Sequence, residues 1–298
     1  MWGCSPRACS ARALGVSAPF VTRFAPSPTG FLHRGHAFSA LCAFAAAQAA
    51  GGDFLLRIED IDATRVRPEF EAAIYEDLRW LGLSWRQPVR RQSEHLADYE
   101  AALDHLAAEG LVYRCFRTRR EVAQAMASAP HGAMDTFRSA PLPKAEEAAR
   151  LARGEPFAWR LSLEAAQGRL GGFESLTFRE EGLGPNGETG LIQARPELGG
   201  DVVLARKDVG VAYHLAVVCD DALQGITHVI RGCDLYEAAH VQRLLQLLLD
   251  LPTPVYRHHR LLAGPDGKRY AKRDKAETLR ALREAGMTPE RLRQEMGL

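Results

Sequence analysis

Near the start of the chain stand the fourteen residues Arg23-Phe-Ala-Pro-Ser-Pro-Thr-Gly-Phe-Leu-His-Arg-Gly-His36. Two prolines and a glycine in this stretch stiffen and then turn the backbone. An apolar run at residues 20–25 leads into the turn, and an alanine-rich run at residues 37–50 follows it. The pattern predicts a short strand, a tight turn and a buried helix that ends at two glycines.

The second half of this turn has the chemistry of a phosphate site. His33 and His36 carry ring N–H donors at the start of the expected helix, where backbone N–H groups and the helix dipole favour anions. Gly35 has no Cβ, so a ligand can approach the backbone closely. The alternative is a tight strand-to-helix turn with two surface histidines, because short motifs often match by chance.

The rest of the chain alternates between predicted strands and predicted helices. Strand, helix, strand, helix at this spacing predicts an α/β fold, a Rossmann-like parallel sheet with right-handed crossovers. A stretch rich in Gly, Pro and charge is expected to be an insertion between two halves of the sheet. The elements are expected at 53–58 (strand), 68–81 and 94–110 (helices), 201–205 and 211–218 (ordered segments), 226–230 (strand), and 235–251 and 276–285 (helices).

These patterns predict a division of the chain into five parts. The expected parts are a disordered N-terminal extension at 1–19, a first catalytic half at 20–114, an inserted subdomain at 115–200, a second catalytic half at 201–251, and a basic loop with a C-terminal helical segment at 252–298.

Composition narrows the class of protein. The chain has 298 residues, 46% of them hydrophobic, which suffices for one large or two small domains. Its 38 basic and 37 acidic residues neither demand nor exclude a nucleic-acid partner. The six cysteines form no disulfide framework, so a reducing, cytoplasmic setting is expected. The longest apolar run is too short to span a bilayer, and residues 1–19 have no apolar core of a secretory signal.

Two further motifs carry charge at the ends of predicted strands. Arg57-Ile-Glu-Asp-Ile-Asp62 places three carboxylates at the carboxyl end of a strand, where one of them can hold an ammonium group. The alternative is a solvated acidic loop. Arg231 follows the strand at 226–230 and is suited to bidentate capture of a carboxylate. Its alternative is a salt bridge to Asp220 or Asp221.

A basic loop, Gly267-Lys-Arg-Tyr-Ala-Lys-Arg-Asp274, stands near the end of the chain. Mobile cationic loops of this kind stabilise departing phosphates, where charge develops in the transition state. The alternative is a solvated charge run before a helix. The remaining histidines have no metal-binding spacing, so no metal site is expected.

Taken in order, these segments resemble the catalytic domain of class I glutamyl-tRNA synthetases. The matching blocks are the opening motif, L-R-I-E-D-I-D at 56–62, Y-H-L-A-V-V-C-D-D at 213–221, T-H-V-I-R-G-C-D-L at 227–235 and the basic loop, within about residues 21–286. The chain stops where such an enzyme would continue into its anticodon-binding domain. It therefore looks most like the truncated family of glutamyl-queuosine tRNA(Asp) synthetases, which attach glutamate to the queuosine base in the anticodon of tRNA(Asp).

The resemblance implies a ligase that activates L-glutamate with ATP. It implies that Mg²⁺ arrives with ATP, that the acceptor is tRNA(Asp) carrying queuosine, and that the protein is a monomer. The residues carried over for glutamate are Arg23, Phe24, Ala25, Pro26, Ser27, Glu59, Tyr213 and Arg231. Those carried over for ATP are His33, Gly35, His36 and Lys272, of which His33, His36 and Lys272 are expected to be catalytic.

Two departures from the family pattern stand out. Ala271 occupies a position where the family commonly has serine, which leaves its effect on activity open. Many members carry zinc on a Cys-x-Cys pair followed by a tyrosine and another cysteine, but this chain has Cys115-Phe-Arg117 and no further cysteine before Cys219. One thiolate does not make a tetrahedral site, so zinc is not expected.

The sequence leaves two alternative functions open, and it does not settle the role of one arginine-rich stretch. One alternative is a truncated glutamyl-tRNA synthetase that charges a tRNA 3′ end. Another is a catalytically retired paralogue that serves as a binding or regulatory module. The arginine-rich stretch at 114–120 either contacts tRNA phosphates or begins a solvated helix.

Overall fold

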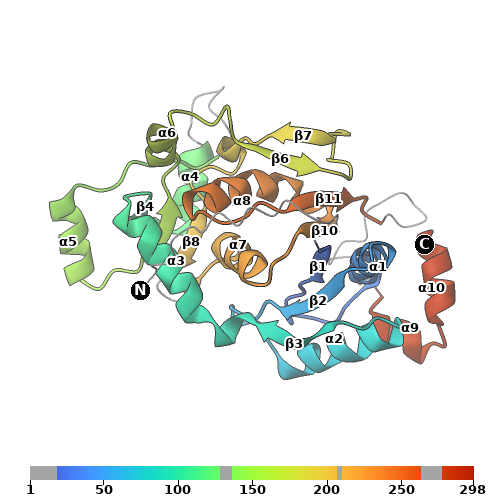
Figure 1. Cartoon of the computed structure of the whole chain (residues 1–298). Helices are drawn as coiled ribbons and strands as arrows, with labels where there is room; N and C mark the ends of the chain where they lie inside the picture. Colours follow the sequence, from blue (N-terminus) through green and yellow to red (C-terminus); the bar gives the residue numbers. More distant parts are fainter. Residues whose placement is uncertain (1–18, 128–135, 207–209, 263–276) are drawn as a thin grey trace.

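The computed structural model describes residues 19–127, 136–206, 210–262 and 277–298 (Figure 1). Residues 1–18 of the extension predicted at 1–19, and the whole basic loop with Ala271 and Lys272, lie outside the described residues. The elements up to residue 127 are β1 (Val21–Phe24), α1 (Arg34–Ala49), β2 (Asp53–Ile58), α2 (Pro68–Trp80), β3 (Arg86–Arg91), α3 (Leu96–Ala108), β4 (Val112–Cys115) and α4 (Arg119–Ala127). Those that follow are α5 (Lys144–Ala152), β5 (Ala158–Leu161), α6 (Leu163–Leu170), β6 (Thr177–Glu180), β7 (Gly190–Gln193), β8 (Val203–Arg206), β9 (Gly210–Val211), α7 (Tyr213–Leu223), β10 (His228–Gly232), α8 (Tyr236–Leu248), β11 (Val255–His259), α9 (Leu279–Glu284) and α10 (Pro289–Met296).

The central strands form the predicted parallel arrangement. β1, β2 and β3 pair in parallel, and so do β10, β11 and β6, with β7 antiparallel at the edge. β1 lies beside β10, and the backbone N–H of Thr227 donates to the carbonyl of Val21 at 2.9 Å. Two strands about 200 residues apart in the chain are thus neighbours, which makes their carboxyl ends a topological switch point where α/β sheets bind ligands.

Helices cover both faces of these strands. In Figure 1, α1 lies to the right of the strands, and α3 and α7 lie to the left. Side chains along β2 alternate accordingly: Leu56 packs in the cluster with α1 and α2, and Leu55 packs in the cluster with α3, α7 and α8. Four fully buried alanines of α1, at positions 37, 40, 43 and 47, let this helix approach the sheet closely.

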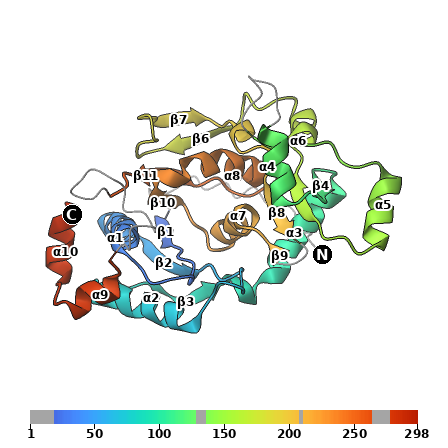
Figure 2. The same ribbon diagram turned by 180° about the vertical axis from the view of Figure 1, so that it is seen from behind.

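A second, antiparallel sheet lies beside the central one. Its strand order is β4-β5-β8-β9, whereas β6 and β7 join the central strands through β11 (Figure 2). The stretch at 115–200 therefore contributes strands to both sheets. The predicted domain boundaries stay a prediction.

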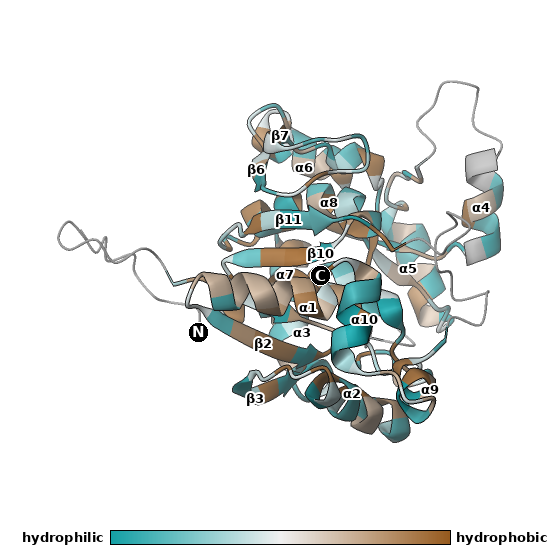
Figure 3. Cartoon of the chain, turned by 90° about the vertical axis from the view of Figure 1, so that its right-hand side faces the viewer, coloured by the Kyte–Doolittle hydropathy of each residue, from teal (hydrophilic) through white to brown (hydrophobic). Residues whose placement is uncertain are grey.

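The structure corrects two element boundaries and adds a final helix. The first helix begins at Arg34 and not at 37, because His33 and His36 cap it as described below. Arg231 lies within β10 and does not follow it. A final helix, α10, was missed because it is largely hydrophilic (Figure 3); only Leu292 and Met296 of its residues are buried. No helix among the described residues has the length and apolarity needed to cross a membrane.

Candidate active site

A cavity of about 790 Å³ lies at the carboxyl ends of β1 and β10, at the switch point of the sheet. Every predicted site residue that the structure describes lines it. Lys272 lies outside the described residues. The lining residues that the sequence predicted are Arg23, Phe24, Ala25, Pro26, Ser27, His33, Gly35, His36, Glu59, Tyr213 and Arg231. The substrate contacts assigned to them stay predictions.

His33 and His36 form the N-terminal cap of α1. Nδ1 of His33 accepts from the backbone N–H of Gly35 at 3.1 Å, and Nδ1 of His36 accepts from the backbone N–H of His33 at 3.2 Å. Since both Nδ1 atoms accept, the proton of each neutral ring lies on Nε2. A Cβ on Gly35 would come within 3.0 Å of the His33 ring, so the glycine also makes room for this cap.

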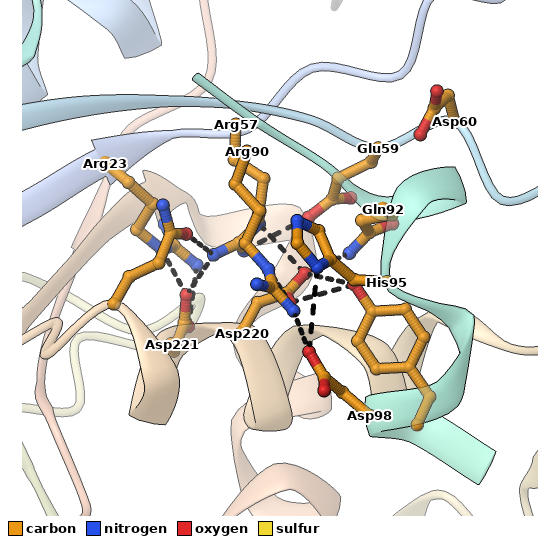
Figure 4. Close-up of polar contacts among 12 residues, drawn as sticks. Arg23, Arg57, Glu59, Asp60, Arg90, Gln92, His95, Asp98, Asp220 and Asp221 are labelled. Atoms are coloured by element: carbon orange, nitrogen blue, oxygen red, sulfur yellow. Dashed lines mark hydrogen bonds and ion pairs between the residues drawn. The ribbon is translucent and has the colours of Figure 1, made fainter. Parts of the chain in front are cut away.

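Arg57 is the centre of a buried ionic cluster behind the cavity (Figure 4). It contacts three carboxylates: Asp221 at 2.8 Å, Glu59 at 3.2 Å and Asp220 at 3.5 Å. Arg23 donates twice to Asp221, through Nε at 3.0 Å and Nη2 at 3.2 Å. Although burial opposes its charge, Asp221, Glu59 and Asp220 hold the pKa of Arg57 above its ordinary value. Arg23 and Glu59 are therefore held in place from behind.

Asp220 belongs to the same cluster but faces away from the cavity. It accepts hydrogen bonds from Arg90 at 2.6 Å, Gln92 at 2.8 Å and Tyr99 at 2.8 Å. These bonds tie α7 to β3 and α3 (Figure 4). Its role is structural, since it does not line the cavity.

The three carboxylates of the acidic loop have separate roles. Glu59 lines the cavity, and burial raises its pKa in spite of Arg57 and Arg23. A cation placed beside it would offset that desolvation. Asp60 is buried and accepts from the backbone and hydroxyl of Ser93, at 2.8 and 2.6 Å. Asp62 pairs with Arg65 at 2.7 Å. Only the first of these carboxylates fits an ammonium site.

Arg231 does not pair with Asp220 or Asp221, the alternative that its sequence context left open. Its guanidinium is buried and held by neutral groups: Nε donates to His258 at 3.0 Å, and Nη1 donates to Gln242 at 2.9 Å and to Tyr213 at 3.3 Å. Nη2 has no hydrogen-bond partner among the described residues. A buried, unpaired charged donor on a cavity wall favours an anionic ligand.

Behind Arg231 lie His258 and Glu180, which no sequence motif indicated. Nδ1 of His258 lies 2.5 Å from Oε2 of Glu180, and Oε1 of that carboxylate accepts from the backbone N–H groups of His258 and Gly182. Although burial opposes ionisation, these hydrogen bonds hold the pKa of Glu180 below its ordinary value. Burial also lowers the pKa of His258, so the neutral ring donates from Nδ1 and accepts from Arg231 at Nε2.

The residues that support the site differ in whether the local sequence indicates their role. Arg57 interrupts an apolar strand, D-F-L-L-R-I, and a charge inside a buried strand needs carboxylate partners. The position of Arg57 in this strand therefore indicates a buried ionic cluster. Glu180 and His258 are 78 residues apart and carry no local signal.

The described residues contain no group of three or more His, Cys, Asp or Glu side chains placed to hold a metal ion. Cys115 is buried and unpaired, as expected of a lone thiol. The absence of zinc from this protein stays a prediction.

Comparison with known proteins places this site in a family. Residues 19–298 match the family model of class I tRNA synthetases (E and Q), catalytic domain. The chain is 46% identical over 286 residues to a glutamyl-Q tRNA(Asp) synthetase of Rhodobacter capsulatus, covering 93% of this chain and 100% of that protein. The chain belongs to the glutamyl-Q tRNA(Asp) synthetase family. A glutamyl-Q tRNA(Asp) synthetase of Symbiobacterium thermophilum is 42% identical, over 90% of this chain and 82% of that protein.

Glutamate–tRNA ligases are similar over a smaller share of their own length than the two glutamyl-Q tRNA(Asp) synthetases. A glutamate–tRNA ligase 2 of Jannaschia sp. is 37% identical over 93% of this chain but only 59% of that protein. Among solved structures, the glutamate-tRNA synthetase of Elizabethkingia anophelis superposes with a TM-score of 0.71 at 28% identity, over 86% of this chain and 53% of that one. These matches agree with the predicted class I synthetase fold.

Proposed function

We propose that this protein activates L-glutamate with ATP as glutamyl-adenylate and transfers the glutamyl group to the queuosine base in the anticodon of tRNA(Asp). The observation that carries the proposal is that one cavity combines groups for both small substrates. Glu59 and Arg231 have the charges that an amino acid with two carboxylates needs, and the α1 N-terminus with its two histidines has the donors that phosphates need. The names of the relatives support the acceptor.

The proposed activation step needs positioning and charge stabilisation more than a protein nucleophile. An oxygen of the glutamate α-carboxylate attacks the α-phosphorus of ATP, and the bond from that phosphorus to the bridging oxygen breaks to release pyrophosphate. His33 and His36, with the proton on Nε2, stabilise phosphate charge. Lys272 is proposed to reach the same phosphates, and Mg²⁺ would enter with ATP.

In the proposed transfer step, a hydroxyl oxygen of the modified base attacks the carbonyl carbon of the adenylate. The bond from that carbon to the phosphate oxygen breaks, and AMP leaves with the hydroxyl proton. A cytoplasmic location is part of the same proposal, in keeping with four unpaired cysteines among the described residues. A monomeric state is also proposed.

The test has two arms. Glutamate-dependent exchange of labelled pyrophosphate into ATP should occur without any RNA, and should fail with glutamine. Labelled glutamate should then appear in the anticodon fragment of nuclease-cut tRNA(Asp) that carries queuosine, and not in tRNA(Asp) without it. Label at a tRNA 3′ end would support the 3′-charging alternative, and absence of exchange would support the retired paralogue.

We expect Glu180 and His258 to act on glutamate through Arg231. His258→Leu removes the acceptor for Nε of Arg231, and the KM for glutamate in pyrophosphate exchange should rise about tenfold, the loss of one hydrogen bond to a charged donor. His258→Gln keeps an acceptor oxygen and should restore most of the affinity. The KM for ATP serves as the internal control, and an equal rise in both constants would contradict a positioning role.

A further inference from the structure

A second cavity, of about 870 Å³, adjoins the first. The two share four lining residues, Ser27, Thr29, Glu59 and Tyr213. The remaining wall of the second cavity comes mainly from residues 115–118 and 156–158 and from β8 and β9, which belong to the antiparallel sheet or its flanks. A molecule in this cavity would therefore meet a molecule in the first one beside Glu59 and Tyr213.

We propose that the second cavity receives the acceptor nucleoside of the RNA, with its base against Phe116 and Phe157 and an adjoining phosphate on Arg117. The inference rests on the proposed function, since that function requires an acceptor to approach the activated glutamate from outside the first cavity. The residues that carry it lie outside the set predicted for glutamate and ATP.

The charge of the wall suits a polyanion. Four arginines line the second cavity, against two carboxylates. Arg117 is exposed, and its charge is one of the causes that lower the pKa of Glu121. An exposed guanidinium on the cavity wall can also receive a phosphate. The other lining arginines are Arg65, Arg160 and Arg206.

The aromatic part of the wall is held in place before any ligand arrives. The rings of Phe116 and Phe157 lie 5.6 Å apart, and the guanidinium of Arg114 lies 5.4 Å from the Phe157 ring and 4.3 Å from the Trp159 ring. Glu147 of α5 anchors Arg114 by an ion pair at 2.5 Å. Both phenylalanines are only half-buried, so they retain surface for stacking against a base.

This cavity also gives a role to the departure from the family's cysteine pattern. The positions of the first two cysteines hold Cys115, which is buried, and Arg117, which is exposed; both line the second cavity. Here the segment brings an aromatic ring and a cation to the wall, where the family pattern has metal-binding thiolates. This arrangement gives two residues of the arginine-rich stretch at 114–120 a role. Arg114 supports the rings of Phe157 and Trp159, and Arg117 lines the cavity.

The test separates activation from transfer. In Phe116→Ala and Arg117→Ala, glutamate-dependent pyrophosphate exchange without RNA should stay within twofold of the unaltered protein. Single-turnover transfer from preformed adenylate to queuosine-containing tRNA(Asp) should fall about tenfold in each. Arg179→Ala, an exposed arginine on β6 away from both cavities, is the matched control and should change neither rate.

Binding of the queuosine-containing anticodon stem-loop provides a second readout that needs no catalysis. Arg117→Ala should reduce the slope of log affinity against log salt by about one, and Phe116→Ala should weaken binding with the slope unchanged. Phe116→Leu keeps the apolar volume without the ring, and covers the case in which the alanine variant fails to fold. The proposal would be overturned if transfer and stem-loop binding in all these variants stayed within twofold of the unaltered protein. It would also be overturned if exchange and transfer fell by the same factor. An unaltered protein without exchange overturns the proposed function instead, and stem-loop binding then still decides about the cavity.

Discussion

We expect the Arg57→Met variant to unfold with a free energy about 3–5 kcal/mol below that of the unaltered protein, the cost of removing one partner from a buried ion cluster. The side chain of Arg57 has no exposed surface, and its loss leaves Asp220, Asp221 and Glu59 without their shared cation. Methionine keeps most of the length and apolar volume of the stem, so the change isolates the charge. Denaturation by urea at neutral pH measures this difference in the free energy of unfolding.

The matched control is Arg86→Met on the neighbouring strand β3. Arg86 also pairs with a carboxylate, Asp53 at 2.8 Å, but both side chains are largely exposed. Exposed pairs contribute about 0–1 kcal/mol, so this variant should unfold almost as the unaltered protein does. Equal losses in the two variants would contradict the claim that the buried cluster holds β1, β2 and α7 together.

Arg231→Met should lower kcat/KM for glutamate in pyrophosphate exchange about 100-fold, which corresponds to about 3 kcal/mol for a charge-assisted contact in a desolvated site. The KM for ATP should change little, because the histidine cap of α1 is built from other residues. The side chain is buried among His258, Gln242 and Tyr213, and its unpaired Nη2 is the donor that we assign to the substrate carboxylate.

Two variants sharpen this prediction. Arg257→Met on the adjacent strand β11 removes an exposed arginine paired with Glu181 at 2.9 Å, and should leave kcat/KM for glutamate unchanged. Arg231→Lys keeps the charge but has no fork to engage three partners at once, so its activity should lie between those of the unaltered protein and Arg231→Met. An Arg231→Met variant that uses glutamate as well as the unaltered protein would remove Arg231 from the site.

Local patterns predicted the framework well where one segment contains the whole signal. The strand at 53–58 has the bounds that were expected, because two glycines end the preceding helix and an acidic loop follows the apolar run. The first helix was placed three residues late, since the capping geometry of His33 and His36 is not an apolar pattern. The final helix was missed because it buries one narrow edge of a polar sequence.

The sequence likewise predicted one part of the site and not the other. The residues expected to face the substrates could be picked out from sequence alone, because their motifs lie at strand ends and at a helix start, and a parallel sheet gathers those ends at one edge. The residues that pair with them behind the cavity could not be predicted from the sequence. Asp221 pairs with Arg23 and Arg57 and not with Arg231, and Arg231 is held by His258, because β1, β2 and α7 meet on one side of the switch point and β10 and β11 meet on the other. Which charges neutralise one another depends on distances of a few ångströms between segments 160 to 200 residues apart, and only the packed sheet sets those distances.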